Sequence, residues 1–528
     1  MHRQFSDDAP NLRELAVGGT IPMELSKVLA NVEVREIRWT GETDDLQRLM
    51  QPKQEISGLA YDSRQVAPGF LFFCIPGQKT DGHNFAAQAV EGGAAVLVVE
   101  RFVDLKVPQI RVTSTRESLA LAAGAFYGHP SEHLLMIGVT GTNGKTTTTY
   151  MIEAVLKAKG YSVGVIGTIG NQLGEKRWPA AHTTPESSDL QKLLAEMRDD
   201  GADAVVMEVS SHSLDQHRVL GVNFDIAAFT NLTQDHLDYH HTLENYRAAK
   251  GKLFRELGQK ESKKGIVKRA VINADDPSAD YFLQVSSVPA VTYGVEEDAA
   301  IRAKDWDVTP QGARCTVQYP GGTVDMTLQL TGRFNISNSL AAFTVGWIVG
   351  MEPEQIVEAL QSLRGVPGRF ESVDQGQPFS VIVDYAHTPD GLVNVLNTAE
   401  ALAEGKIVTV FGCGGDRDRT KRPIMGAVVA EMSDIAVVTS DNPRTENPHR
   451  IIEDILPGVQ AVPGIEYKVE PDRKKAIALA LSMANPGDLV MIAGKGHENY
   501  QIVGKEVLPF DDREVARQVL RGMGYDRS

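Results

Sequence analysis

The stretch Gly138 to Thr148, which reads GVTGTNGKTTT, decides the fold and directly follows the apolar run Leu134 to Ile137. An apolar strand followed by a glycine-rich turn and a Lys-Thr pair is typical of a phosphate-binding loop. Backbone N–H groups of such a loop and the N-terminus of the next helix point at an anion, Lys145 adds a positive charge, and Thr146 offers a hydroxyl to Mg²⁺. The sequence therefore predicts a site for ATP or GTP.

The loop departs from the usual pattern at one position. Val139 stands where the first glycine is expected, and Gly138 lies one residue earlier. A Gly-Lys-Thr alone could be a turn that opens a helix. Apolar residues recur at helical spacing between Tyr150 and Ala158, and together with the preceding strand they favour nucleotide binding.

Length and composition restrict the class of protein. A chain of 528 residues is too long for one core, so about three domains are expected. The net charge of −16 argues against a nucleic-acid surface and favours a small-molecule substrate. The three cysteines form no CxxC pair, which argues against a disulfide framework and a cysteine zinc site. The first residues lack the apolar segment of a signal peptide, and the longest apolar stretch, near 119–126, is far shorter than a membrane span. We expect a cytoplasmic protein without a membrane span, acting as a monomer.

Short apolar runs alternate with helical patterns along the chain, which predicts an α/β protein with largely parallel sheets covered by helices. Breaker residues at 128–131 and 365–368 suggest boundaries. The expected domains are residues 1–131, 132–365 and 366–528. The lysine-rich segment 260–268 is expected to be a solvated loop. The expected strands lie at 69–75, 94–99, 163–166, 204–207, 226–229, 270–272, 381–383, 407–411, 435–439 and 489–493.

Polar clusters follow the expected strands of the middle domain, where ligands gather in parallel sheets. Glu208 ends one strand, and it is placed either as the partner of Thr146 on Mg²⁺ or as a turn acid. His236 and His240 lie four residues apart, a spacing that could suggest zinc. Because no cysteine or third histidine joins them in the sequence, a single metal-binding His236 or a turn histidine is favoured.

Several motifs occur in order and together resemble the Mur ligases of peptidoglycan synthesis, especially the branch that adds the third peptide residue. They span nearly the whole chain. They are GVTGTNGKTTT, HTTPE at 182–186, MEVSSHSLDQHR at 207–218, NLTQDHLDYH at 231–240 and TGRFNISNSLAA at 331–342.

The resemblance implies a fold and a reaction. It implies a central P-loop domain between an N-terminal UDP-binding domain and a C-terminal Rossmann-like domain. ATP would phosphorylate the free carboxylate of UDP-N-acetylmuramoyl-L-alanyl-D-glutamate, and an amine would then attack the acyl phosphate. Phosphate-loop amides, Lys145 and Mg²⁺ can supply the charge neutralisation that this chemistry needs.

The resemblance also implies site residues in the middle domain. The catalytic set would be Lys145, Glu208, His236 and Lys250. The metal ligands would be Thr146, Glu208, His236 and Lys250, the last as a carbamylated lysine, with Lys252 as the competing candidate. From its residues alone, Lys250 looks like a surface helix lysine. The ATP contacts would be Gly141, Thr142, Asn143, Gly144, Lys145, Thr146, Thr147, Asn335, Arg369, Asp384 and His387.

The substrate contacts that the resemblance implies lie in all three domains. Those of the UDP-linked substrate would be Ser63, Gln78, Lys79, Thr80, Thr183, Thr184, Ser210, Gln216 and Arg218. Those of the amine, meso-diaminopimelate, would be Arg417, Asp441, Asn442, Pro443, Arg444, Gly494 and Glu498.

The choice of amine depends on Arg444. Diaminopimelate carries a carboxylate beside its distal amine, and lysine does not. An arginine fork binds a carboxylate in bidentate fashion, with Arg417 as a second donor, while Asp441 and Glu498 can hold the ammonium. The stretch Asp441-Asn442-Pro443 would also make a good helix start without any ligand. The alternatives are the same ligase using L-lysine, a folylpolyglutamate synthetase-like enzyme, and a P-loop switch or motor ATPase.

Overall fold

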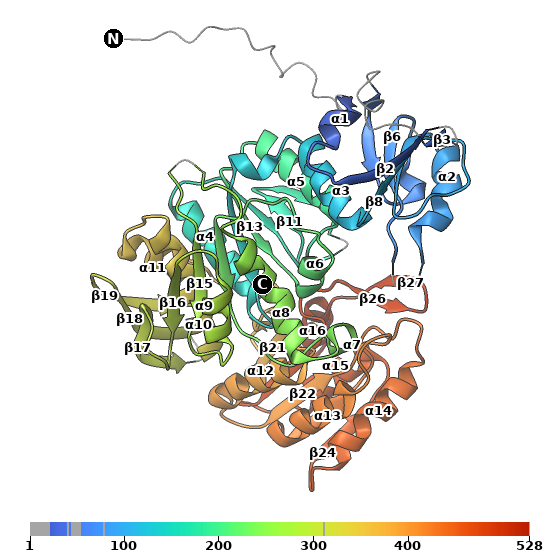
Figure 1. Cartoon of the computed structure of the whole chain (residues 1–528). Helices are drawn as coiled ribbons and strands as arrows, with labels where there is room; N and C mark the ends of the chain where they lie inside the picture. The colour runs from blue at the N-terminus through green and yellow to red at the C-terminus, as the bar shows by residue number, and fades with distance from the viewer. Residues whose placement is uncertain are drawn as a thin grey trace. The chain divides into compact units, whose positions relative to one another are not determined.

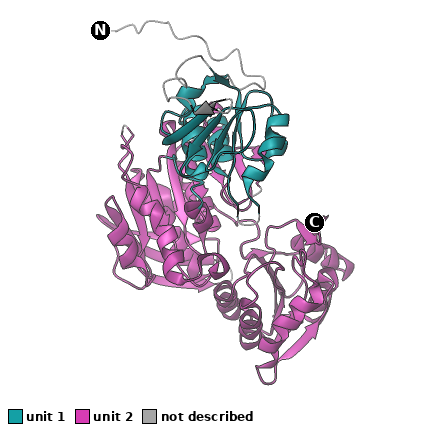
Figure 2. Ribbon diagram, turned by 45° about the vertical axis from the view of Figure 1, so that its right-hand side comes forward, with its two compact units in different colours: residues 1–130, 186–196, 216–222 teal, residues 131–185, 197–215, 223–528 magenta. Residues whose placement is uncertain are grey.

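The computed structural model describes residues 22–39, 42–43, 54–77, 80–180, 182–263, 265–309 and 312–526. The chain divides into two compact units, drawn in two colours in Figure 2. Unit 1 comprises residues 1–130, 186–196 and 216–222, and unit 2 comprises residues 131–185, 197–215 and 223–528. Of the helices in the described part of the chain, none combines the length and apolarity that crossing a membrane requires.

Unit 1 contains a six-stranded sheet in the order β3-β2-β8-β7-β6-β5. Strands β5 to β8 are parallel, and β2 joins β8 antiparallel. Its apolar core lies on both faces of the sheet, as expected for parallel strands. The elements are β1 (Met23–Glu24), α1 (Leu25–Val28), β2 (Val34–Trp39), β3 (Glu42–Thr43), β4 (Glu55–Ile56), β5 (Gly58–Ala60), β6 (Phe70–Phe73), α2 (Ala86–Glu91), β7 (Ala94–Val99), β8 (Gln109–Val112) and α3 (Thr115–Phe126).

Unit 2 contains an eleven-stranded sheet in the order β12-β11-β10-β13-β9-β14-β15-β16-β17-β18-β19. The strands from β10 to β17 in that order are parallel, and antiparallel strands extend the sheet at both edges. Its strands are β9 (Leu135–Thr140), β10 (Val163–Ile166), β11 (Asn171–Leu173), β12 (Lys176–Trp178), β13 (Ala204–Glu208), β14 (Ile226–Phe229), β15 (Arg269–Asn273), β16 (Ala290–Gly294), β17 (Ile301–Thr309), β18 (Gly312–Tyr319) and β19 (Gly322–Leu328).

Helix α4, which follows the phosphate loop, packs against α10 and α11 (Figure 1). Met151, Ile152, Val155 and Leu156 of α4 are fully buried in this core. The predicted helix is confirmed, but its predicted apolar face is only partly right, because Tyr150 and Ala154 are half-buried and Ala158 is exposed. The helices of unit 2 that accompany this sheet are α4 (Lys145–Ala158), α6 (Ser211–Asp215), α7 (Leu237–His240), α8 (Leu243–Glu256), α9 (Ala279–Val285), α10 (Arg333–Ile348) and α11 (Pro353–Gln361). Helix α5 (Ser187–Asp199) belongs to unit 1 as far as Glu196.

The last part of unit 2 has its own six-stranded sheet, ordered β20-β21-β25-β22-β23-β24. All its neighbours from β21 to β24 are parallel. The elements are β20 (Glu371–Ser372), β21 (Ser380–Asp384), α12 (Pro389–Leu402), β22 (Ile407–Phe411), α13 (Lys421–Met432), β23 (Ile435–Val438), α14 (Pro448–Gln460), β24 (Glu466–Val469), α15 (Arg473–Met483), β25 (Leu489–Ala493), β26 (Tyr500–Val503), β27 (Glu506–Pro509) and α16 (Asp512–Gly522).

Each expected strand matches a strand of the structure to within a few residues, and the α/β class is confirmed. The domain boundaries at 131/132 and 365/366 stay predictions. The two compact units divide the chain at Pro130/Ser131. In unit 2, the strands of the eleven-stranded sheet precede residue 366 in the sequence, and those of the six-stranded sheet follow it.

Two local predictions are wrong. The segment 260–268 is not simply solvated, because the Lys263 ammonium is buried against Asp225 at 2.5 Å and Lys268 is also buried. Carbonyl oxygens of Leu134 and Asn223, which precede β9 and β14, accept from Lys263, and the Leu257 oxygen at the end of α8 accepts from Lys268. Asp441-Asn442-Pro443 does not start a helix either, since α14 begins at Pro448 with Asn447 as its cap.

Candidate functional site

The phosphate loop joins β9 to α4, and hydrogen bonds with neighbouring residues fix its conformation. Asn231, just after β14, accepts from the backbone N–H of Thr142 at 2.8 Å and from that of Asn143 at 2.8 Å. Gly144 adopts a φ of 82°, and a Cβ there would lie 2.4 Å from Oδ1 of Asn338. Only glycine fits this turn, which starts α4 and points its first N–H groups into the pocket.

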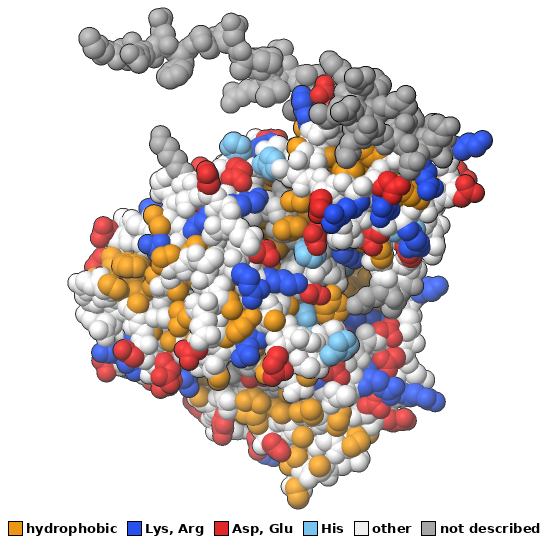
Figure 3. Space-filling view, in the orientation of Figure 1, with side chains coloured by type: hydrophobic (Ala, Val, Ile, Leu, Met, Phe, Trp, Pro, Cys, Tyr) orange, Lys and Arg blue, Asp and Glu red, His pale blue; other side chains and the backbone are white. Residues whose placement is uncertain are grey.

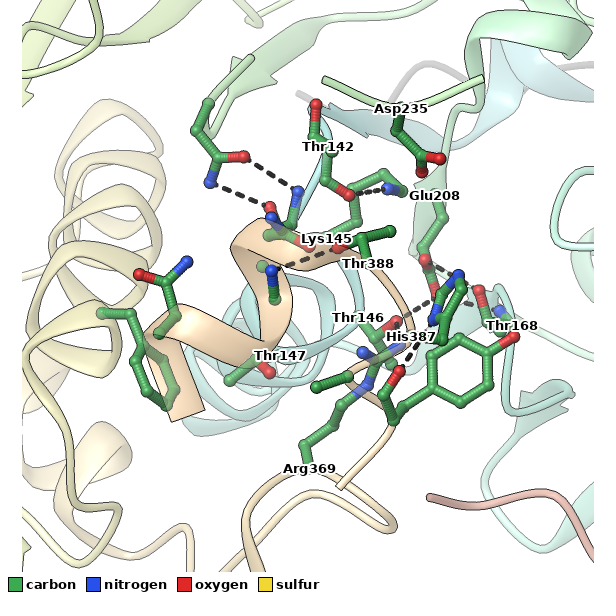
Figure 4. A pocket seen from close by; sticks show the side chains of 18 of the residues that line it. Thr142, Lys145, Thr146, Thr147, Thr168, Glu208, Asp235, Arg369, His387 and Thr388 are labelled. Carbon is green, nitrogen blue, oxygen red and sulfur yellow. Dashed lines mark hydrogen bonds between the residues drawn. The ribbon is translucent and has the colours of Figure 1, made fainter. Parts of the chain in front are cut away.

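Glu208, at the end of β13, is anchored beside the first turn of α4. Its Oε1 accepts from the Thr146 hydroxyl at 3.0 Å and from the Thr168 N–H at 2.8 Å, and its Oε2 accepts from the Thr168 hydroxyl at 3.0 Å. Figure 4 shows Thr146 and Thr168 both directed at this carboxylate. The alternative of a simple turn acid therefore loses its support, because Glu208 lines the pocket with Thr146.

Two lysines converge on the carbonyls of the loop. The Lys145 ammonium lies 2.9 Å from the Gly141 oxygen and 2.7 Å from the Thr142 oxygen. The Lys250 amine lies 2.7 Å from the same Gly141 oxygen and 4.4 Å from the Tyr246 ring centroid. Desolvation lowers the pKa of both lysines, and for Lys250 the nearby Lys145 charge lowers it further, so that its pKa lies well below the usual value.

The surface-lysine interpretation of Lys250 is wrong, because only 1% of the residue is exposed. Its competitor Lys252 points elsewhere, to Asp215 at 2.9 Å. Helix α8 turns by about 100° per residue, so positions two apart face different directions. The geometry favours Lys250 as the lysine of the pocket.

His236 lines the pocket next to Asp235, with a 3.4 Å separation between Nε2 and the carboxylate. Desolvation outweighs the attraction of Asp235 and lowers the pKa of His236 to about 3, so the ring is neutral and available as a ligand. His240 is buried and does not line the pocket, and its Nε2 lies 2.9 Å from the Ser211 hydroxyl. The described residues contain no group of three or more His, Cys, Asp or Glu side chains arranged for a metal ion.

The last part of the chain closes the other side of the pocket. Nη2 of Arg369 donates to the Thr146 hydroxyl at 2.9 Å, and its guanidinium lies 4.7 Å from the Tyr385 ring centroid. Asp384 accepts from the Phe370 and Ala386 N–H groups, and burial raises its pKa. Burial next to Lys421 lowers the pKa of His387 to about 4.

Most of the predicted ATP contacts line one pocket. Gly141 contributes its carbonyl rather than lining the pocket. Asn335 is turned away, because its amide donates to the Thr331 oxygen at 2.8 Å. Asn338, one helical turn later, lines the pocket instead. The predicted residues that line it are Thr142, Asn143, Gly144, Lys145, Thr146, Thr147, Thr183, Glu208, Ser210, His236, Lys250, Arg369, Asp384 and His387.

The predicted contacts of the UDP-linked substrate fall in both units. In unit 1, the Ser63 hydroxyl donates to Gln88, Thr80 is exposed, and Arg218 pairs with Glu186 at 3.0 Å and donates to Gln216 at 2.8 Å. In unit 2, buried Thr184 links the Glu208 carbonyl to Ser210. Gln78 and Lys79 lie outside the described residues.

A second cluster, at the carboxyl ends of β22, β23 and β25, contains the predicted amine contacts. The guanidiniums of Arg417 and Arg444 donate to the backbone oxygens of Asp416 at 3.0 Å and Gly415 at 2.9 Å. Desolvation and the neighbouring Arg444 charge lower the pKa of Arg417. Among the described residues neither arginine has a carboxylate within salt-bridge distance. The pair is therefore suited to an external anion.

The acidic part of this cluster is already organised by Lys495, a buried cation that the sequence interpretation did not include. Its ammonium lies 3.0 Å from Glu498, 3.0 Å from the Asn442 oxygen and 3.9 Å from Asp441. Two carboxylates against one ammonium leave a net negative charge. Gly494 makes room, since a Cβ there would lie 2.6 Å from Asp441. The Pro443 carbonyl lies close to Gly415, since a Cβ at Gly415 would be 1.9 Å from its oxygen.

Sequence comparisons identify the family. Profiles of the Mur ligase middle domain, the Mur ligase glutamate ligase domain and the Mur ligase family catalytic domain match residues 139–346, 368–496 and 55–127. The chain is 49% identical over 467 residues to the UDP-N-acetylmuramoyl-L-alanyl-D-glutamate–2,6-diaminopimelate ligase of Geobacillus thermodenitrificans, covering 88% of this chain and 95% of that protein. This chain belongs to the Mur ligase family.

Further comparisons agree with this membership. The protein of the same name from Syntrophomonas wolfei is 48% identical, covering 89% of this chain and 95% of that one. A solved structure of a ligase of this name superposes with a TM-score of 0.66 at 31% identity, over 96% of this chain and all of that one. The chain is thus an ATP-dependent ligase with the three-domain α/β fold of its family, as the sequence motifs predicted.

The structure adds pocket residues that the sequence interpretation missed. Thr168 follows β10, so the strand-end rule could have found it. Tyr385 and Thr388 lie within the same stretch as Asp384 and His387. Asp235 and Tyr246 carried no separate signal, because their role depends on how α7 and α8 pack.

Proposed function

We propose that this Mur ligase adds meso-diaminopimelate to UDP-N-acetylmuramoyl-L-alanyl-D-glutamate in peptidoglycan precursor synthesis. The names of its relatives and the geometry of the arginine cluster support this choice. The cytoplasm is the proposed compartment, in keeping with three buried free cysteines. We also propose that it acts as a monomer, because one chain supplies both the phosphate pocket and the arginine cluster.

The phosphate pocket is suited to carboxylate activation. A carboxylate oxygen of the substrate attacks the γ-phosphorus of ATP, the bond to the bridging oxygen breaks, and ADP leaves. Lys145 and Arg369 both line the pocket and provide positive charge there. The amine then attacks the acyl carbon, an amide forms, and phosphate leaves after a proton is lost from nitrogen. Residues from two sheets line the pocket, which would exclude water from the acyl phosphate.

Mg²⁺ fits the donors of this pocket. The Thr146 hydroxyl and the Glu208 carboxylate are hard oxygen ligands held 3.0 Å apart, and neutral His236 lies in the same pocket. A bound Mg²⁺ would neutralise charge on the transferring phosphoryl group. Lys250 would become a further oxygen donor through carbamylation, which requires a neutral amine, and its burial favours the neutral form.

The observation that carries the choice of amine is the Arg417–Arg444 pair. Diaminopimelate brings a carboxylate that neutralises both guanidiniums, whereas lysine would leave the pair without an anion. The net negative cluster of Asp441, Glu498 and Lys495 would hold the ammonium of the same stereocentre. We expect discrimination of at least about 100-fold in kcat/KM, because lysine leaves two charged donors unpaired.

The test measures phosphate release from ATP with UDP-muramoyl dipeptide and either meso-diaminopimelate or L-lysine. Release only with diaminopimelate supports the proposal, and equal turnover with both amines would reject it. Arg444→Ala should lose the diaminopimelate reaction while ATP binding is retained. Arg450→Ala, which removes an exposed arginine from α14, serves as the control. Loss of ATP binding in Arg444→Ala would show that this residue has another role.

A further inference from the structure

Two loops that carry the paired arginines are both held in unusual backbone conformations. The first loop, residues 412–418, follows β22, and the second, residues 441–446, follows β23. Asp416 in the first has a φ of 54°, and Arg444 in the second has a φ of 51°. Non-glycine residues keep such angles only where the surrounding contacts determine them, often at functional sites. The contacts that hold these two residues at such angles are therefore candidates for a functional role.

A fully buried arginine hydrogen-bonds to both loops. Arg422 in α13 donates from Nη1 to Glu446 Oε2 at 2.9 Å and from Nη2 to Glu446 Oε1 at 2.8 Å, a bidentate ion pair. Nη2 also lies 3.2 Å from the Gly414 oxygen. One guanidinium therefore contacts the first loop through a carbonyl and the second through a carboxylate.

Glu446, which belongs to the second loop, also hydrogen-bonds to the first loop. Its Oε1 accepts from the backbone N–H of Asp416 at 2.6 Å. The Asp416 carboxylate in turn accepts from the Thr445 hydroxyl at 2.8 Å, and the Gly415 N–H donates to the Asn442 oxygen at 2.9 Å. The arginine bond holds the pKa of Glu446 at about 2, so the carboxylate stays charged at every working pH. The two loops are thus closed into one hydrogen-bonded ring.

This ring positions the guanidiniums of Arg417 and Arg444. Nη1 of Arg444 donates to the Gly415 oxygen, and a Cβ on Gly414 would lie 2.8 Å from Nη1 of Arg444 and 3.8 Å from Cγ of Arg417. Gly414 therefore separates the two arginines, and its carbonyl is the one that Arg422 binds. A shift of either loop would separate the two donors that must meet one carboxylate.

We propose that Arg422 and Glu446 are positioning residues for amine recognition, which fix the register of the two loops and so pair Arg417 with Arg444. This inference rests on the proposed diaminopimelate specificity. Neither residue needs to touch the substrate. Their effect passes through the two arginines to the affinity for the carboxylate of the amine, and the phosphate pocket should be unaffected.

The chain supplies a matched control in Asp454. Its carboxylate also pairs with Arg422, at 2.8 Å, and with Arg419, at 2.9 Å, but among the described residues it hydrogen-bonds to neither loop. Glu446→Ala and Asp454→Ala each remove one carboxylate from the same buried guanidinium. A general structural role would make the two variants alike, whereas positioning requires them to differ.

The experiment measures KM for meso-diaminopimelate, L-lysine, ATP and the UDP-linked substrate, and the thermal shift induced by diaminopimelate, in the full-length enzyme. We expect Glu446→Ala to raise KM for diaminopimelate at least about tenfold, as loss of a well-aligned charged pair does, with the KM values for ATP and the UDP-linked substrate within about twofold of wild type. Asp454→Ala should leave all of them within about twofold. Glu446→Gln, which keeps the shape and one acceptor, should show an intermediate rise and covers the case in which Glu446→Ala folds poorly.

The outcomes separate the two proposals. If the wild-type enzyme uses both amines equally, the proposed specificity fails, and with it the positioning role. If the wild type selects diaminopimelate but Glu446→Ala and Glu446→Gln keep its KM, or Asp454→Ala raises that KM as much, only the positioning role is overturned. A fall in kcat at unchanged KM would equally overturn it.

Discussion

The side-chain amide of Asn143 donates to Oδ2 of Asp390 at 2.6 Å, although the two residues are 247 positions apart. Asn143 belongs to the phosphate loop, and Asp390 lies in the first turn of α12. The same Asp390 oxygen accepts from the Thr233 hydroxyl at 3.1 Å and from Asn394 at 3.2 Å. One carboxylate thus links the loop that binds phosphate to the sheet that carries Asp384 and His387.

Removing this link should weaken catalysis. We expect Asp390→Ala to reduce kcat/KM for ATP by roughly tenfold or more, because hydrogen bonds to a charged group contribute about 1.5–3 kcal/mol each. Glu400→Ala removes an exposed carboxylate from the same helix and should have no effect. Steady-state kinetics at varied ATP compares them. Equal kinetics in the two variants would show that the Asn143–Asp390 contact does not contribute to closure.

A second prediction concerns Lys250. If its buried amine is carbamylated, Lys250→Ala should lose nearly all ligase activity, and added short-chain carboxylates should restore part of it. Incubation with ¹³C-labelled CO₂ should give a carbamate signal in the wild-type NMR spectrum that the variant lacks. Lys252→Ala, which loses only its contact to Asp215, is the control and should stay active. A fully active Lys250→Ala would exclude the role.

The pH dependence of that modification follows from the direction of the pKa shift. Burial and Lys145 lower the pKa of Lys250, so the amine is neutral over a wider range than in an exposed lysine. Acid protonates the amine and releases CO₂. We expect the carbamate signal and the activity to fall together as pH decreases, and to return when CO₂ is supplied at neutral pH. Activity that persists without the carbamate signal would show that catalysis does not require the carbamate.

The sequence predicted the strands around the phosphate loop because each is a short apolar run that ends in a turn. It also placed Glu208 correctly next to Thr146, since carboxyl ends of parallel strands share one edge. These predictions use only local patterns and one rule of topology. They succeed where neighbouring strands in the sheet follow simple βα units.

Other features depend on packing between distant segments, which no local pattern encodes. Arg369 meets Thr146 from 223 positions away, and Asp390 meets Asn143 from farther still. Lys250 and Lys263 were expected to be exposed, yet each binds oxygens of another element, and buried Lys495 was not predicted at all. A charged residue gives no sequence signal of burial, because its partner fixes its position. The sequence named Asn335, and that Asn338 lines the pocket instead depends on the direction in which α10 presents its side chains.

A third prediction tests stability against pH through His497. Desolvation, with nearby Arg369, lowers its pKa in the folded state to about 3, whereas an unfolded histidine titrates near pH 6.5. Between these values the unfolded chain binds the extra proton, so stability falls as pH falls below about 6.5. Replacing His497 with Gln should remove about 1 kcal/mol of the loss between pH 7.5 and 5.5. Urea unfolding at the two pH values measures it, with exposed His449→Gln as the control. An unchanged pH slope in His497→Gln would contradict the prediction.

The last prediction concerns the basic segment near residue 264, whose Lys263 binds the central sheet where strands β9 and β14 begin. Its ammonium donates to the Leu134 and Asn223 oxygens and pairs with Asp225, which is fully buried. Lys263→Met would leave Asp225 buried without its counter-charge, which typically costs about 3–5 kcal/mol. Lys468→Met removes an exposed pair with Glu466 and should cost less than about 1 kcal/mol. Thermal unfolding followed by circular dichroism should therefore show a clear fall in Tm for Lys263→Met alone. Combining Lys263→Met with Asp225→Asn should restore part of the loss, because the buried charge is then removed. If the double variant is no more stable than Lys263→Met, the pair does not act through charge.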